Sequence, residues 1–224
     1  MKRETLQSIF RFLLTRLARV EFCGLEHLPP SGPIIVATNH MSRMDTLYLF
    51  INPARPDITA LVADKYQKYP VFNWILNTAG IIWLDRSKAD FGAFRLAVDV
   101  LKGGVSLGIA PEGTRSTTGQ LQAGKQGTAL LALKAGVPVV PVGISGSEEY
   151  FRRLLTLRRP NLRLTFGPAI HLPPLDRDNR EESLQKMTDE IMCRIAILLP
   201  EKYWGYYHDH PRLKEMLADP APYR

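Results

Sequence analysis

A histidine and an aspartate lie five positions apart in the run from Asn39 to Asp45 (NHMSRMD), directly after an apolar segment. A neutral imidazole takes up a proton efficiently near pH 7, and a carboxylate beside it fixes the tautomer that does so. His40 and Asp45 therefore predict a general base held by its orienting acid. The spacing also allows a second interpretation, in which Asn39, Ser42 or Asp45 caps a helix and His40 has no chemical role.

A second polar motif, Pro111 to Ser116 (PEGTRS), also follows an apolar segment. Arg115 offers a planar guanidinium that matches phosphate oxygens, and Gly113 lets a backbone approach an anion closely. Glu112 either orients Arg115 or accepts a hydrogen bond from a substrate. Taken alone, Glu112 and Arg115 are equally compatible with a surface ion pair at a turn.

A third motif, Gly80 to Arg86 (GIIWLDR), ends in an adjacent aspartate and arginine. Arg86 is another candidate phosphate ligand, and Asp85 with Arg86 is also compatible with an ordinary surface ion pair. A base held by a carboxylate, together with guanidinium groups for an anion, would equip a protein to move an acyl group onto the hydroxyl of a phosphorylated acceptor.

The elements that would position these motifs are apolar strands alternating with helical segments. This alternation predicts an α/β fold, a single domain with a central, mostly parallel or mixed sheet and helices on both faces. Ligands of such sheets bind beyond the carboxyl ends of the strands, where all three motifs stand. Strands are expected at 34–38, 58–63, 81–84, 105–110, 139–144 and 162–166, and helices at 4–20, 45–51, 70–79, 89–102, 127–135 and 179–199, the last with a capping box of Asn179 and Glu182.

The first helix is strongly basic and carries a leucine and phenylalanine stripe. This pattern is typical of a helix that lies on anionic lipid, although soluble helices that dock on a domain have the same stripe. We therefore expect residues 1–21 to be an amphipathic membrane-association helix, 22–202 to be the catalytic domain and 203–224 to be an irregular tail.

The 224 residues carry a net charge of +7, which favours anionic partners such as nucleic acid, an anionic membrane or phosphorylated metabolites. No basic run is interleaved with aromatic residues, so nucleic acid is not expected. The longest uncharged run, 69–84, is too short and too interrupted to span a bilayer, and no signal peptide is recognisable. Two distant cysteines favour a reducing compartment, and no His/Cys cluster has metal-ligand spacing.

Four ordered blocks make the chain resemble the glycerolipid acyltransferase family, the PlsC-like enzymes typified by 1-acylglycerol-3-phosphate O-acyltransferase. The run from Asn39 to Asp45 matches the family's H-x4-D block, Gly80 to Arg86 its second block and Pro111 to Ser116 its E-G-T-R block. Val137 to Val142 (VPVVPV) matches its proline-punctuated strand. Order and spacing agree from about residue 32 to residue 167.

The resemblance implies transfer of a fatty acyl group from acyl-CoA or acyl carrier protein to lysophosphatidate, which gives phosphatidate in phospholipid biosynthesis. His40 would be the base and Asp45 its orienting acid, with no metal and no cofactor. The enzyme would sit peripherally on an anionic membrane surface at its cytoplasmic face. The residues expected to bind the acceptor are Lys65, Arg86, Glu112, Gly113, Thr114 and Arg115.

Other acceptors stay open, such as another lysophospholipid or a lipid alcohol or amine, and so does a non-catalytic protein that binds anionic lipid. The chain departs from the family pattern at Ala110, where phenylalanine is usual, at Gly124, where an aromatic is common, and at Arg43-Met44. These positions bear on the shape of the substrate groove. Apolar residues near Phe72, Trp74 and Ile75 would line the acyl groove, dip into lipid or simply pack in the core.

Overall fold

The computed structural model describes residues 1–64, 67–84 and 90–223. In these ranges seven strands form one sheet in the order β1-β7-β6-β2-β5-β3-β4. All neighbouring strands are parallel except β6 and β7, which are antiparallel. The mostly parallel, mixed sheet confirms the predicted fold class. The strands are β1 (Arg19–Cys23), β2 (Ile35–Thr38), β3 (Thr59–Ala63), β4 (Ile82–Leu84), β5 (Leu107–Ile109), β6 (Val139–Ser145) and β7 (Asn161–Phe166).

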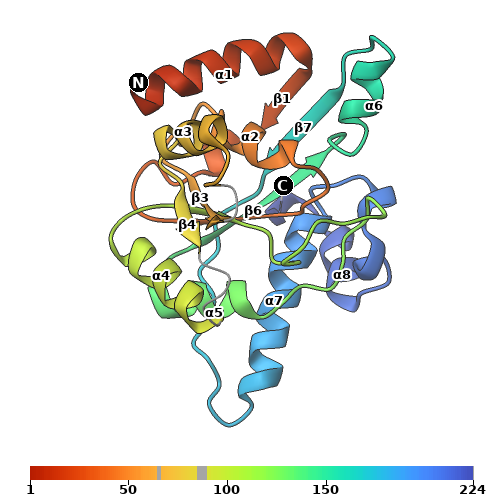
Figure 1. The fold of residues 1–224 in the computed structure, drawn as a ribbon. Helices are drawn as coiled ribbons and strands as arrows, with labels where there is room; N and C mark the ends of the chain where they lie inside the picture. The colour runs from red at the N-terminus through yellow and green to blue at the C-terminus, as the bar shows by residue number, and fades with distance from the viewer. Residues whose placement is uncertain (65–66, 85–89, 224) are drawn as a thin grey trace.

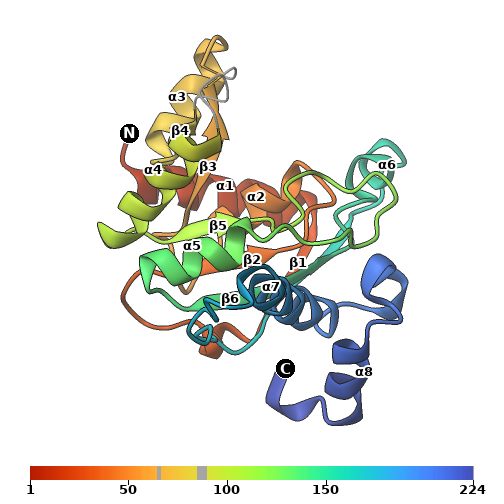
Figure 2. The ribbon, with the colours of Figure 1, turned by 90° about the horizontal axis from the view of Figure 1, so that it is seen from below.

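Helices cover both faces of the sheet, as Figures 1 and 2 show. On one face α4 (Asp90–Lys102), α5 (Gly127–Ala135), α7 (Arg180–Ala196) and α8 (Pro211–Ala218) bury a cluster that includes Ile35 and Ala37. On the other face α1 (Arg3–Leu17), α2 (Met44–Phe50) and α6 (Tyr150–Leu155) pack against Ile34 and Val36. A further helix, α3 (Pro70–Thr78), contacts α1. Successive side chains around β2 therefore enter different cores, which is why its sequence is apolar throughout.

The N-terminal helix docks on the domain by one face and exposes apolar side chains on the other. Leu6 and Leu14 are buried, and Gln7 donates to the carbonyls of Phe50 and Pro56 at 3.1 and 2.8 Å. The exposed large apolar side chains of α1 are Ile9, Phe12, Leu13 and Leu17. No helix of the described residues has the length and hydropathy to cross a bilayer.

Three elements differ from the sequence expectation. The predicted first helix stops at Leu17, because residues 19–23 instead form β1, which pairs in parallel with β7. The six-residue helix α6 is too short to show a periodic pattern. Within the expected irregular tail, α8 forms because Leu213 and Met216 are buried and His210 Nδ1 accepts a hydrogen bond from the Arg212 N–H.

The predicted capping box at α7 is wrong. Asn179 precedes the helix but makes no side-chain cap, and its amide donates to Asp176 Oδ2 at 3.3 Å instead. Glu182 points along the helix and pairs with Lys186 at 2.7 Å. The Asn179 side chain is thus turned toward a local carboxylate, and its oxygen accepts no hydrogen bond from the first turn of the helix.

Candidate active site

Two neighbouring parallel strands, β2 and β5, bring their carboxyl ends to one edge of the sheet. His40 follows the end of β2, and Glu112 follows the end of β5. Two hydrogen bonds join the following loops: the His40 N–H donates to Glu112 Oε1 at 3.1 Å, and the Ser116 N–H donates to the His40 carbonyl at 2.8 Å. The PEGTRS loop therefore lies directly against the turn that carries the histidine.

The imidazole of His40 is held by the carboxylate of Asp45. The distance from His40 Nδ1 to Asp45 Oδ2 is 3.0 Å, and the side chains are 26% and 2% exposed. An ionised carboxylate only accepts hydrogen bonds, so Nδ1 must carry the proton and Nε2 keeps its lone pair. Within the described residues Nε2 has no hydrogen-bond partner. The pair thus presents a free basic nitrogen at a partly exposed position.

Asp45 also fixes the backbone of the same turn. Its Oδ2 accepts hydrogen bonds from the N–H groups of Met41 at 2.8 Å and Ser42 at 2.7 Å. Asp45 lies in the first turn of α2, and its side chain reaches back over residues 40–42. Residues five positions apart do not face each other on a regular helix. His40 and Asp45 meet because the histidine lies in the turn before the helix. The sequence allowed Asp45 either to orient the imidazole or to bind the backbone of the turn. The structure shows one carboxylate doing both.

Asn39, directly before the histidine, locks the end of β2 to β6. Its side-chain amide donates to the Ile144 carbonyl at 2.8 Å and accepts from the Ile144 N–H at 2.7 Å. Asn39 is fully buried. These two bonds continue the ladder beyond the last β2–β6 pair, Thr38 with Val142. The sequence offered Asn39 only as a possible helix cap, since its partner lies 105 positions away.

Glu112 is buried and its two oxygens are used inside the protein. Besides the His40 N–H, it accepts hydrogen bonds from the backbone and side-chain amides of Gln122 at 3.0 and 3.3 Å. Burial raises the pKa of Glu112, an effect that these hydrogen bonds partly oppose. The structure shows no ion pair between Glu112 and Arg115, the orienting contact expected from sequence. Glu112 instead braces the catalytic turn, residues 39–45, and Gln122 is a contributor that no sequence signal revealed.

The remaining expected binding residues are distributed unevenly. Gly113, Thr114 and Arg115 are exposed, and Arg115 makes no side-chain hydrogen bond or ion pair with the described part of the chain. Gly113 has φ +72°, and a Cβ there would lie 3.1 Å from Lys125 Nζ. Lys125, which the sequence analysis did not select, thus passes over the same loop. Lys65 and Arg86 lie outside the described residues.

The C-terminal segment binds the continuation of the PEGTRS loop, residues 121–124, by two hydrogen bonds. The Leu121 N–H donates to the Tyr203 carbonyl at 2.8 Å, and the Gly124 N–H donates to the Tyr207 hydroxyl at 3.0 Å. A Cβ at Gly124 would lie 2.7 Å from Met192 Cγ. Burial raises the pKa of Tyr207 far above its ordinary value. An aromatic side chain from the tail therefore lies beside Gly124.

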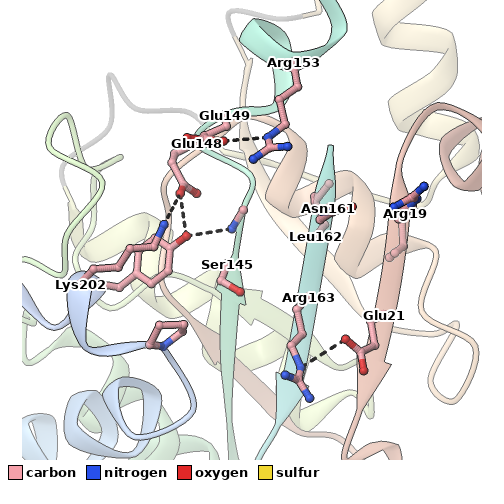
Figure 3. A pocket seen from close by; sticks show the side chains of 14 residues that line it. Arg19, Glu21, Ser145, Glu148, Glu149, Arg153, Asn161, Leu162, Arg163 and Lys202 are labelled. Atoms are coloured by element: carbon pink, nitrogen blue, oxygen red, sulfur yellow. Dashed lines mark hydrogen bonds and ion pairs between the residues drawn. The ribbon is translucent and has the colours of Figure 1, made fainter. Parts of the chain in front are cut away.

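Two hollows flank this region. A polar cavity of about 510 Å³ lies beyond the end of β6, and its lining does not include His40, Asp45 or Glu112. Its charges are mostly paired, with Glu149 on Arg153 at 2.7 Å and Arg163 on Glu21 at 3.5 Å (Figure 3). A narrow apolar crevice of about 50 Å³ lies beside α2. It is lined by Phe10, Thr46, Leu47, Leu49, Phe50, Ile58, Thr59, Ala60, Ile75, Leu76, Ala79 and Ile81.

Of the three apolar residues that the sequence indicated on α3, only one lines the crevice. Ile75 lines it, whereas Phe72 and Trp74 are more than half exposed and point outward. The crevice borders the helix that carries Asp45, so an apolar chain lying in it would end near the catalytic turn.

A cysteine, histidine and aspartate also meet between α7 and α8. Cys193 Sγ lies 3.5 Å from His210 Nδ1, and His210 Nε2 lies 3.7 Å from Asp189. Cys193 is fully buried, and burial raises the pKa of its thiol to about 12. A protonated, inaccessible thiol is no nucleophile, so this cluster is part of the packing between the two helices.

The family model for acyltransferases matches residues 19–145, more than half of the chain and the part that contains the His40–Asp45 pair, Glu112 and Arg115. The chain belongs to the acyltransferase family. This confirms the resemblance seen in the four sequence blocks. The protein is accordingly an enzyme that transfers acyl groups.

Two bacterial relatives of this acyltransferase are named 1-acyl-sn-glycerol-3-phosphate acyltransferases. The chain is 26% identical over 178 residues to the 1-acyl-sn-glycerol-3-phosphate acyltransferase of Borreliella burgdorferi, with 78% of this chain and 71% of that one covered. It is 30% identical over 171 residues to that of Pseudomonas aeruginosa, with 72% and 64% covered. The crystal structure of PlsC from Thermotoga maritima, a 1-acyl-sn-glycerophosphate acyltransferase, superposes with a TM-score of 0.67 at 27% identity, covering 84% of this chain and 76% of that one. The chain therefore spans about two thirds of the bacterial relatives' length.

Proposed function

We propose that this acyltransferase moves a fatty acyl group from an acyl thioester, acyl-CoA or acyl carrier protein, to the free hydroxyl of 1-acylglycerol-3-phosphate. The product is phosphatidate. The observation that carries this proposal is the His40–Asp45 pair, whose free Nε2 stands beside a loop with exposed cations. The names of the relatives support the choice of acceptor.

The chemistry needs only groups that the turn provides. The acceptor hydroxyl oxygen attacks the thioester carbonyl, and His40 Nε2 takes the hydroxyl proton as the carbon–oxygen bond forms. The carbon–sulfur bond then breaks, and the thiolate leaves with the proton from the imidazolium. Asp45 stabilises that imidazolium through Nδ1, in the role that the acid has in a Ser-His-Asp arrangement. The acceptor itself is the nucleophile, so no acyl-enzyme forms.

The acceptor phosphate is assigned to the loop after β5. Arg115 extends from it, and Lys125 passes over Gly113. Two cations on one loop would hold a dianionic phosphate. Thr114 offers a hydroxyl at the same place. Arg86, the last residue of the second sequence block, stays in the proposal as a further phosphate ligand, and so does Lys65, which lies outside the four blocks.

Glu112 acts as a positioning residue. It holds the His40 N–H from one oxygen and Gln122 from the other, so it couples the catalytic turn to the phosphate loop. An acyl chain would lie along the apolar crevice between α1, α2 and α3, whose lining includes Thr46, the residue after Asp45. The crevice of about 50 Å³ would have to open to admit the chain.

The substrates are lipids, so the enzyme works as a peripheral protein on an anionic membrane surface, at its cytoplasmic face. The exposed apolar side of α1, with Arg16 exposed over the ring of Phe12, supports the membrane contact.

Thiol release from acyl-CoA, measured with and without lysophosphatidate and followed by product mass, tests the reaction. We expect release that depends on lysophosphatidate and a product of phosphatidate mass. His40→Ala should lower turnover by about three decades or more, as loss of a general base does. A His40→Ala enzyme with near-normal turnover would exclude the mechanism. Faster release with another lysophospholipid, or with a lipid alcohol or amine, would change the acceptor and keep the chemistry.

A further inference from the structure

The segment from Tyr150 to Arg159, which consists of α6 and its C-terminal turn, exposes several large apolar side chains close together, as α1 and the start of α3 also do. Leu157 is 96% exposed, Leu155 is 86% exposed and Phe151 is 58% exposed. Single exposed apolar residues are common on soluble proteins, but three large ones within seven positions are not. We call this segment the α6 tip.

The backbone of the α6 tip holds one of these leucines in a strained position. Leu157 has φ +55°, the only positive value among the non-glycine residues described. The turn is fixed by hydrogen bonds from the Leu157 N–H to the Leu154 carbonyl at 3.0 Å and from the Arg158 N–H to the Arg153 carbonyl at 2.9 Å. Helices commonly end in this conformation with glycine, so leucine is costly here for folding. A costly, fully exposed leucine points to a partner outside the chain.

The charge of the α6 tip identifies the kind of partner. Four arginines lie within its ten residues, and the segment contains no acidic residue. Arg152 is 73% exposed, and Arg158 is exposed without a side-chain partner in the described part of the chain. Arg152 and Arg153 both pair with Glu149, just before the helix. Leucine and phenylalanine surrounded by arginine match an anionic bilayer, with charged head groups above an apolar interior.

The tip adjoins the C-terminal end of α1. Arg159 donates from Nη2 to the carbonyls of Thr15 at 2.6 Å and Ala18 at 3.2 Å, so it binds the C-terminal end of α1. Both elements lie at the same end of the molecule in Figure 1. Phe12, Leu13 and Leu17 are exposed on that helix, between 47% and 57%.

The tip is also joined to the catalytic turn. Tyr150, at the base of α6, is buried, and its ring packs edge-on against that of Tyr48 with centroids 5.9 Å apart. Tyr48 lies on α2, the helix that carries Asp45. A bilayer in contact with the tip and with α1 would therefore lie at a fixed orientation to the site.

We propose that the α6 tip is a second membrane contact, which inserts Phe151, Leu155 and Leu157 into an anionic bilayer while Arg152 and Arg158 bind the lipid phosphates. This inference rests on the proposed function, in which the enzyme works peripherally on a membrane. With α1 alone the protein could roll about the helix axis on the surface. The second contact stops that rotation and turns the catalytic edge toward lipid-borne acceptor.

Sedimentation of the full chain with phosphatidylcholine vesicles that contain phosphatidylglycerol tests the charged part. Arg152→Gln with Arg158→Gln removes two cations from the tip, each worth about fivefold in binding near an anionic surface, so we expect a loss of roughly 25-fold. Arg177→Gln with Arg180→Gln is the matched control. Both control arginines are exposed, and they lie at the start of α7, at the opposite end of the molecule (Figure 1).

The apolar part is tested by Leu155→Ser with Leu157→Ser, expected to weaken vesicle binding by at least about tenfold, since binding scales with inserted apolar area. Val105→Ser is its control, since Val105 is exposed just before β5, at the opposite edge of the sheet. Leu157→Gly separates lipid contact from folding. Glycine relieves the strained φ, so the melting temperature should hold or rise while vesicle binding falls.

Two binding results would overturn the proposal: tip variants that bind vesicles as the wild type does, which would leave the surface to a protein partner, or tip and control variants that weaken equally. Turnover separates this proposal from the reaction itself. Tip variants should keep wild-type thiol release with dispersed, monomeric lysophosphatidate and lose it with vesicle-borne acceptor. Equal losses of thiol release with monomeric and with vesicle-borne acceptor would also count against a membrane role of the tip. A wild type that binds vesicles through the tip but ignores lysophosphatidate would instead refute only the reaction.

Discussion

Substituting Asp45 separates its chemical role from its structural one. The Oδ2 atom accepts hydrogen bonds from His40 Nδ1 and from the N–H groups of Met41 and Ser42. The other oxygen, Oδ1, is buried and has no partner among the described residues. An asparagine can therefore place its carbonyl oxygen at the Oδ2 position and its amide nitrogen at the Oδ1 position. All three hydrogen bonds would persist, but the negative charge would be lost.

The magnitudes follow from those bonds. A hydrogen bond to a charged group contributes about 1.5–3 kcal/mol and one to a neutral group about 0.5–1.5 kcal/mol. In Asp45→Asn the two hydrogen bonds from the backbone N–H groups would go to a neutral oxygen instead of a charged one. Together this should lower the free energy of unfolding by about 2 kcal/mol. Asp45→Ala removes both bonds and leaves two buried amides unpaired, which should cost about 3–6 kcal/mol.

Turnover should respond differently. Loss of the charge removes stabilisation of the imidazolium, so Asp45→Asn should lower kcat by about two to four decades while the protein stays folded. Denaturant titration gives the free energy of unfolding, and thiol release gives kcat. An Asp45→Asn enzyme with kcat within threefold of wild type would show that the carboxylate only shapes the turn. Equal stability losses for Asn and Ala would show that the amide bonds contribute nothing.

Three further predictions concern two groups near this turn and one ion-pair cluster between α7 and α8. Glu112→Gln should destabilise the protein by about 2–3 kcal/mol and lower kcat by roughly tenfold. Both oxygens of Glu112 accept hydrogen bonds from N–H groups, so the NH₂ group of a glutamine would face another donor in either orientation. Arg115→Ala should raise the KM for lysophosphatidate by about 10- to 100-fold, the equivalent of one charge-assisted hydrogen bond, with a smaller change in kcat. Burial raises the pKa of Glu190, but hydrogen bonds from Arg212 and Arg194 outweigh it and leave the pKa below the usual value. Stability from this group is present above the ordinary glutamate pKa and disappears as the pH falls through the lowered one, so Glu190→Gln should flatten the acid side of the stability profile.

Each of these predictions has a contrary outcome. An unchanged kcat in Glu112→Gln would mean that the bond from Glu112 to the catalytic turn does not position the base. Unchanged KM and kcat in Arg115→Ala, with Arg115→Lys as the conservative control, would remove the phosphate role. A Glu190→Gln protein that loses stability with acid as steeply as the wild type would place the acid-sensitive group elsewhere.

The sequence by itself determined the architecture and the chemical type of the site. Alternating apolar strands and helical stretches predicted the α/β sheet, because each local period reports which faces a segment must bury. His40 and Asp45 were found because both members of the pair lie within one turn of chain. The four ordered blocks were sufficient to identify the family.

Only the tertiary structure decided which groups support that pair. Asn39 bonds to Ile144, Glu112 bonds to His40, and the tail supplies Tyr207 beside Gly124. Each of these contacts joins residues more than seventy positions apart, and local sequence carries no record of such partners. The same limit explains β1, which exists because it pairs with β7, and α8, which exists because it is packed on α7. Local periodicity encodes burial along one segment, whereas the partner of a polar atom is set by how distant segments are brought together in the fold.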